Sequence, residues 1–147
     1  LNFGFSGNGR MERTVGQFLA ELDPAVFVID CSANTEAEQI TQRAAPLVKQ
    51  LRAARAKTPI LLLDERRWDN APLLPASMQR HKDKTDALRK AYDALLADGV
   101  ENLHFRGADD VLGSDGEATV DGSHPTDLGM MRYADALEPY LRKLLTA

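Results

Sequence analysis

The sequence predicts an α/β fold, a three-layer α/β/α sandwich in which helices cover both faces of a parallel β-sheet. Four short apolar runs alternate with longer stretches whose apolar residues recur at spacings of three and four. This alternation is typical of parallel sheets, because each parallel strand needs a crossover connection, usually a helix. With 147 residues, 44% of them apolar, the chain is expected to form one domain around one core.

Four strands are predicted where short apolar runs are bounded by polar or turn-forming residues. In chain order they are residues 1–5 (LNFGF), 25–30 (AVFVID), 59–64 (PILLLD) and 102–106 (NLHFR). Strands covered on both faces read as continuous apolar runs rather than as alternating ones. The run ILLL therefore favours a central strand.

Four helices are predicted between and after these strands, over residues 10–22, 35–56 and 77–98 and in the stretch that follows Pro125. Thr35 and Glu38 have the spacing of a capping box at the start of the second helix. Gly99 is expected to end the third helix. The core-facing positions expected are Met11, Val15, Phe18, Leu19 and Leu22, then Ile40, Leu47, Val48 and Leu51, then Leu88, Tyr92, Leu95 and Leu96, and finally Leu128, Met131, Ala134, Leu137, Leu141 and Leu144.

Charge and composition narrow the classes of partner. The chain carries 18 basic and 22 acidic residues, a net charge of −4 without long single-sign runs. Nucleic acid and anionic membranes are therefore not expected partners, and a small neutral or polar molecule fits better. The single cysteine, Cys31, excludes an internal disulfide and is interpreted as a buried strand-end residue rather than a nucleophile.

Polar loops follow each predicted strand, at the sheet edge where ligands gather in such folds. Asp121 and His124 lie on the last of these loops, just before the final helix. A carboxylate there can accept the Nδ1 proton of the imidazole and leave Nε2 free to act as a base. The alternative is a surface turn, because Asp, Gly, Ser and Pro all favour turns.

Two earlier loops offer groups that could stabilise an anion. Gly7 and Gly9 in SGNG let the backbone approach a substrate closely, and Asn34 could donate its side-chain amide to the same anion. Each also has a simple structural interpretation, a tight strand-to-helix turn for the glycines and helix capping for Asn34.

Taken together, the segments NFGFSGNG, IDCSAN and DGSHPTDLG resemble blocks II, III and V of the SGNH hydrolases, the GDSL-like esterase and lipase superfamily. The similarity is greatest to the bacterial GDSL-like acylhydrolase branch, and it runs from Leu1 to the last helix. It implies a flavodoxin-like SGNH hydrolase fold, serine ester hydrolysis and no cofactor. In block III, Cys-Ser-Ala-Asn replaces the usual Gly-x-Asn-Asp.

The same resemblance implies roles for four residues. His124 would be the general base and Asp121 would orient it, while the Gly7 N–H and the Asn34 amide would form the oxyanion hole. The nucleophilic serine of the family lies in block I, a strand and turn that precede block II. We therefore expect residues 1–147 to be an SGNH hydrolase domain without its first strand, with the serine upstream of Leu1.

Other assignments stay open at the level of sequence. Ser6 beside Gly7 is an alternative nucleophile, and Ser32 and Ser123 are weaker ones. Arg66 and Trp68, after the third predicted strand, are candidate substrate-binding residues.

Three alternatives to ester hydrolysis are also kept. The same site could transfer the acyl group to a sugar or another alcohol. Asp30 and Asp64 at strand ends could serve a Mg²⁺-dependent phosphohydrolase, although Ser32 stands where that chemistry wants a second carboxylate. The fold could also be a non-catalytic flavodoxin-like module.

Overall fold

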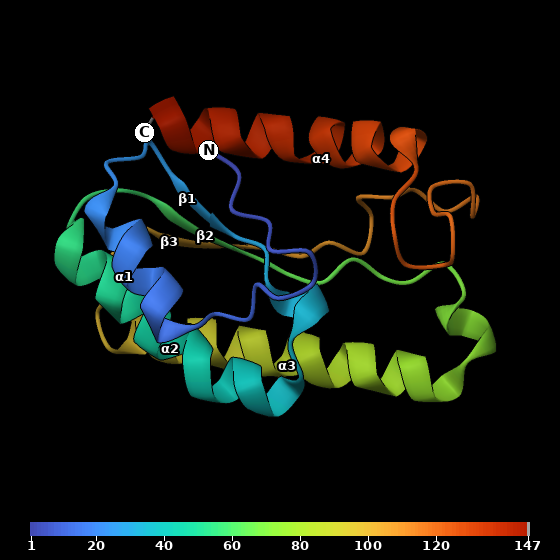
Figure 1. The fold of residues 1–147 in the computed structure, drawn as a ribbon, viewed down its shortest axis with the longest axis horizontal. Helices are drawn as coiled ribbons and strands as arrows, with labels where there is room; N and C mark the ends of the chain where they lie inside the picture. The colour runs from blue at the N-terminus through green and yellow to red at the C-terminus, as the bar shows by residue number, and fades with distance from the viewer. Residues whose placement is uncertain (147) are drawn as a thin grey trace.

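The computed structural model describes residues 1–146 and confirms the α/β class. Three parallel strands in the order β1-β2-β3 form the sheet, and helices lie on both of its sides (Figure 1). The elements in chain order are α1 (Arg13–Glu21), β1 (Phe27–Ile29), the 3₁₀ helix η1 (Ser32–Asn34), α2 (Ala37–Ala54), β2 (Ile60–Leu63), the 3₁₀ helix η2 (Ala71–Leu73), α3 (Pro75–Ala97), β3 (Leu103–Arg106) and α4 (Asp127–Thr146).

The two faces of the sheet carry separate apolar clusters. Helices α1, α2 and α3 lie on one side, and α4 lies on the other (Figure 1). Ile60 and Leu62 of β2 belong to the larger cluster with α2 and α3, whereas Leu63 packs with Leu137 of α4. Successive strand residues point to opposite faces, so a fully apolar strand can serve both layers. All four residues of β2 are buried, as the run ILLL predicted.

Parallel pairing places the carboxyl ends of the strands at one edge of the sheet. In the register of the sheet, Ile29 of β1 pairs with Leu62 of β2, and Leu63 pairs with Arg106 of β3. The polar loops after the three strands therefore start from the same edge, where the sequence predicted a site.

The prediction of a strand over residues 1–5 is wrong. These residues form no strand within the described part of the chain, and Phe3 and Phe5 are 45% and 41% exposed. Their backbone is engaged locally instead. Asn2 accepts from the N–H of Gly4 through its side chain, and the N–H of Asn8 closes a turn on the carbonyl of Phe5. Such local bonds compete with a strand ladder.

The helices were predicted in the right places, with errors at their ends. Helix α1 begins at Arg13 rather than at residue 10, because Met11 takes a left-handed backbone conformation (φ 58°). Helix α3 begins earlier than predicted, at Pro75, a residue suited to a first helical turn.

The capping box of α2 is formed by Glu36 and Gln39 rather than by Thr35 and Glu38. The Thr35 hydroxyl instead donates to the carbonyls of Cys31 and Ser32, both at 3.1 Å, so it closes η1 and is not free to cap α2.

Several predicted core positions are exposed. The predictions for α2 are confirmed, since all four of its named residues are buried. Phe18 of α1, Leu96 of α3, and Leu128 and Met131 of α4 are exposed.

None of the helices within residues 1–146 has the length and apolar character needed to cross a bilayer.

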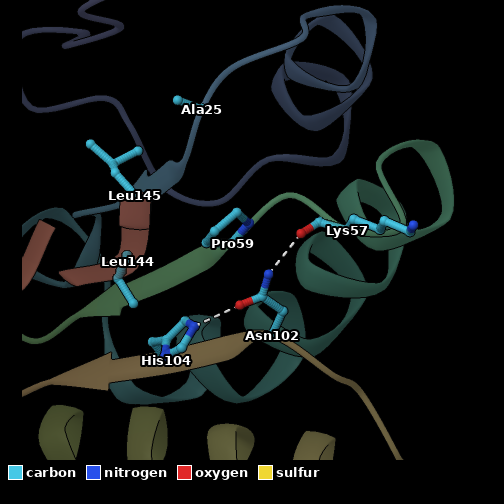
Figure 2. A pocket seen from close by; sticks show the side chains of 7 residues that line it. All are labelled: Ala25, Lys57, Pro59, Asn102, His104, Leu144 and Leu145. Atoms are coloured by element: carbon cyan, nitrogen blue, oxygen red, sulfur yellow. Dashed lines mark hydrogen bonds between the residues drawn. The ribbon is translucent and has the colours of Figure 1, made fainter. Parts of the chain in front are cut away.

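A hollow of about 480 Å³ lies at the amino ends of the strands, lined in part by Pro59, Asn102 and His104 (Figure 2). In it, His104 Nε2 lies 2.8 Å from the side-chain oxygen of Asn102. This hollow is at the opposite edge of the sheet from the predicted site.

Candidate active site

Asp121 and His124 form the hydrogen-bonded pair that their spacing predicted. His124 Nδ1 lies 2.7 Å from Asp121 Oδ2. The other carboxylate oxygen accepts the backbone N–H groups of His124 at 2.8 Å and Ser123 at 3.0 Å. These donors, the His124 N–H first among them, hold the pKa of Asp121 well below its usual range. The carboxylate therefore stays ionised and fixes the imidazole.

The imidazole of His124 is accessible. Its side chain is 74% exposed. Within residues 1–146, Nε2 makes no hydrogen bond, and no serine is bonded to the ring. A histidine held at Nδ1 and open at Nε2 can take a proton from a nucleophile.

The loop that carries the pair is closed on itself just before α4. The N–H of Val120 donates to the carbonyl of His124 at 2.9 Å, and the N–H of Thr126 donates to the carbonyl of Ala118 at 2.8 Å. The Thr126 hydroxyl then accepts the N–H of Gly129 at 3.1 Å, as an N-cap does. The segment DGSHPTDLG thus combines a pair-bearing turn with a helix start.

Gly129 permits the close approach of this loop to α4, and its replacement by alanine should destabilise the protein. A Cβ there would stand 2.1 Å from the carbonyl oxygen of Ala118, a backbone atom that can move only with its loop. We expect the free energy of unfolding to fall by about 1–3 kcal/mol or more, measured by urea unfolding. Gly107→Ala is the control, because a Cβ there meets nothing within 4 Å. Equal stability of the two variants would contradict this packing.

The connection between β2 and α3 holds the same loop from the side. Arg66 Nε donates to the carbonyl of Ser123 at 2.9 Å. The N–H of Asp69 donates to the carbonyl of Gly122 at 2.9 Å, and the Asp69 carboxylate accepts the Thr119 hydroxyl at 2.7 Å. These contacts attach the His124 loop to the segment that follows the carboxyl end of β2, which confirms the expectation that His124 lies on that side of the sheet.

Gly7 and Asn34 also come together. Gly7 has a left-handed backbone (φ 83°), and a Cβ built on it would lie 3.9 Å from the side-chain oxygen of Asn34. Asn34 is the last residue of η1, and its N–H donates to the carbonyl of Cys31 at 3.1 Å. The Asn34 side-chain amide therefore lies beside the Gly7 backbone, as two donors to one anion would require.

The alternative nucleophiles are placed as follows. Ser6 also has a left-handed backbone (φ 49°), and its carbonyl accepts from the side chain of Asn8. Ser32 is fully buried. The Ser123 N–H donates to Asp121, and its carbonyl accepts from Arg66. Burial raises the pKa of the Cys31 thiol to about 11, which leaves it protonated at neutral pH.

The two aspartates considered for a metal site are engaged separately. Asp30 accepts the hydroxyl of Tyr133 at 2.9 Å. Asp64 is buried and accepts the N–H of Glu65 at 2.8 Å. Burial raises the pKa of both carboxyls. Among residues 1–146, no three or more His, Cys, Asp or Glu side chains gather as metal ligands would.

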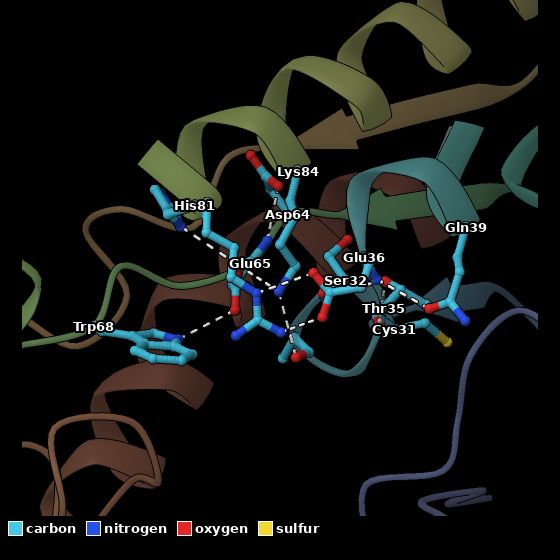
Figure 3. A network of polar contacts seen from close by, with 12 residues as sticks. Cys31, Ser32, Thr35, Glu36, Gln39, Asp64, Glu65, Trp68, His81 and Lys84 are labelled. Carbon is cyan, nitrogen blue, oxygen red and sulfur yellow. Dashed lines mark hydrogen bonds and ion pairs between the residues drawn. The ribbon is translucent and has the colours of Figure 1, made fainter. Parts of the chain in front are cut away.

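A buried polar network lies next to this region, and the sequence reasoning missed it (Figure 3). Glu65, two residues beyond β2, pairs with Lys84 of α3 at 2.8 Å. Trp68 Nε1 donates to the other oxygen of Glu65 at 3.1 Å, and His81 Nδ1 lies 3.7 Å from the carboxylate. One signal was available, since Lys84 stands four residues before Leu88 on the apolar side of its helix.

Known proteins share both the sequence pattern and the fold. Residues 1–142 match the model of the GDSL-like Lipase/Acylhydrolase family. A crystal structure from Bacteroides ovatus, of a protein described as a GDSL-like lipase, is 34% identical, has a TM-score of 0.95 and is matched over 99% of this chain and 43% of that one.

The fold is also that of the salicylyl-acyltransferase SsfX3 from a tetracycline biosynthetic pathway. The identity is 15% and the TM-score 0.78, over 92% of this chain and 42% of that one. No curated protein matches the sequence. The chain thus spans less than half the length of both structures.

Proposed function

Because the chain belongs to the GDSL-like lipase/acylhydrolase family, we propose that the full-length protein is a serine hydrolase that cleaves ester bonds of small molecules. The observation that carries the proposal is the bond of 2.7 Å between Asp121 and His124 Nδ1, in a loop that leaves Nε2 accessible. A histidine oriented by a carboxylate is what a serine needs for activation.

In the proposed mechanism, the serine oxygen attacks the ester carbonyl while His124 Nε2 accepts its proton. The tetrahedral intermediate collapses, the alcohol leaves with the proton from His124, and an acyl-enzyme remains. Water then attacks the acyl carbonyl while His124 takes its proton; the bond to the serine oxygen breaks, the carboxylic acid leaves and His124 returns the proton to the serine oxygen. Asp121 stays ionised throughout and stabilises the imidazolium. The proposed nucleophile is the serine that the family resemblance assigns to block I.

Gly7 and Asn34 are the proposed oxyanion donors. The support is their juxtaposition, because a backbone N–H and a side-chain amide beside each other can receive one developing negative charge. Which side-chain atom of Asn34 faces Gly7 depends on the amide orientation, and the proposed role requires the NH₂ group to face the substrate.

Arg66 and Trp68 are proposed to line the substrate pocket. Arg66 uses Nε to hold Ser123, and its terminal nitrogens make no hydrogen bond within residues 1–146, so they can face a polar ester. Trp68 is fixed through Nε1 to Glu65, and Arg80 stands over its ring at 5.9 Å. A fixed ring offers a rigid apolar surface to an acyl group or a sugar.

The test is hydrolysis of a short p-nitrophenyl ester by the full-length protein, with and without EDTA. We expect release of p-nitrophenol that EDTA does not change. Loss of activity with EDTA would favour the metal-dependent alternative, and no activity on esters of any acyl length would contradict the proposal. Transfer of the acyl group to an added alcohol, followed by mass spectrometry of the products, distinguishes the acyltransferase alternative, because both reactions pass through the same acyl-enzyme.

A further inference from the structure

The Lys84–Glu65 ion pair is almost completely enclosed. Both side chains are 1% exposed, and Nζ lies 2.8 Å from Oε2. Burial alone would raise the pKa of Glu65, but contacts with His81 and Lys84 outweigh it and lower the pKa, so the carboxylate is ionised. A lysine is rarely buried to this extent unless it is paired.

Stability alone is a weak reason for such a pair. Removing two charges from water costs free energy that their mutual attraction only partly returns, and well-packed apolar side chains of similar volume often serve the fold as well. A buried pair is better explained by what its remaining donors and acceptors hold in place.

On one side, the Lys84–Glu65 pair contacts the segment that carries Asn34, a proposed oxyanion donor. Lys84 Nζ also donates to the carbonyl of Ala33 at 3.4 Å, although Lys84 lies on α3 and Ala33 lies in η1. Asn34 directly follows Ala33, so the lysine fixes the peptide that connects these two residues.

On the other side, the pair contacts Trp68, which is proposed to line the substrate pocket. Glu65 Oε1 accepts the indole N–H of Trp68 at 3.1 Å, while Oε2 pairs with Lys84. One carboxylate therefore links the Trp68 ring to the lysine that holds η1. A second ion pair, between Arg80 of α3 and Glu36 at the start of α2, fixes η1 from its far end.

We propose that Lys84 and Glu65 are positioning residues, which hold the Asn34 amide at the oxyanion and couple it to Trp68. This inference rests on the proposed function. Neither residue touches the ester; they act through the backbone of η1 and through the indole. Their loss should therefore lower kcat through Asn34, because small misplacements of a catalytic group cost rate.

The test variant is the double substitution Lys84→Met and Glu65→Gln in the full-length protein. Both replacements keep the approximate volume, and glutamine can still accept from Trp68, so no unpaired charge is left buried. We expect kcat on the p-nitrophenyl ester to fall about 10- to 100-fold with little change in KM. The single variant Lys84→Met is less informative, since it leaves Glu65 buried without its partner.

A double-mutant cycle separates positioning from general damage. Asn34→Ala alone should lower kcat about 10²- to 10³-fold. If Lys84 and Glu65 act through Asn34, their substitution should cause little further loss in the Asn34→Ala background. A full additional 10- to 100-fold loss there would overturn the proposal. Leu88→Ala on the same helix is the control, expected to lower Tm while leaving kcat below the transition unchanged.

Amide hydrogen exchange tests the positioning without any reaction. The N–H groups of Asn34 and Thr35 donate to the carbonyls of Cys31 and Ser32, within η1. In the double variant we expect both to exchange faster, while amides in the middle of α2 keep their protection. Unchanged exchange of Asn34 and Thr35 would overturn the proposal, whereas an inactive wild-type protein with the expected exchange pattern would contradict only the ester hydrolase assignment.

Discussion

Replacing His124 by alanine in the full-length protein is expected to lower kcat on a p-nitrophenyl ester by about 10⁴- to 10⁶-fold, the range found when the base of a serine triad is removed. The reason is that the serine hydroxyl is a weak nucleophile until a base takes its proton. His124 is mostly exposed, so the variant should unfold at the same temperature as the wild type.

His104→Ala is the matched control for this variant. His104 lies at the amino edge of the sheet, where it contacts Asn102 rather than a carboxylate (Figure 2). We expect it to leave kcat unchanged. Equal losses in the two variants would indicate a general effect of removing an imidazole, and an active His124→Ala protein would contradict the assignment of His124 as the base.

Replacing Asp121 by asparagine should lower kcat by about 10⁴-fold, the cost seen when an asparagine takes the place of a triad aspartate. Asp121 accepts three donors, the two backbone N–H groups and the ring. The side-chain oxygen of asparagine can still accept some of these hydrogen bonds, but asparagine can also turn its NH₂ group toward Nδ1. The imidazole then presents the wrong tautomer to the serine, and the imidazolium loses its counter-charge.

Asp135→Asn provides the control for the charge change, because Asp135 is an exposed residue of α4 away from the His124 loop. We expect kcat to remain at the wild-type value in that variant. Circular dichroism of Asp121→Asn should match the wild-type spectrum. A loss of less than 10-fold in Asp121→Asn would mean that the backbone of the loop alone orients His124.

The fold class was predictable because buried parallel strands leave a strong signal. The run ILLL is apolar at every position, and β2 is covered on both faces. Residues 1–5 also carry large apolar side chains, those of Leu1, Phe3 and Phe5, but form no strand, since strand formation depends on neighbouring strands that a local pattern does not reveal. The predicted start of α1 was wrong for a related reason, because the apolar pattern does not reveal the left-handed backbone of Met11.

The contact between Asp121 and His124 was predictable because it is local. Asp121 and His124 are three residues apart on one loop, so their pairing could be read from spacing. Asp69 could not be identified in this way, because its contacts with Thr119 and Gly122 join segments about 50 residues apart. Lys84 and Glu65 were missed for the same reason, and because a lysine in a helix is normally expected to be exposed.

Labelling with a fluorophosphonate tests whether His124 activates a serine for acyl transfer. This reagent forms a phosphonyl ester with an activated serine and releases fluoride, and peptide mapping by mass spectrometry then locates the modified residue. We expect a single labelled serine in the full-length protein, located in the block I segment, and labelling that is lost in His124→Ala but retained in His104→Ala. Labelling of Ser6, or labelling that persists without His124, would contradict the activation of a block I serine by His124.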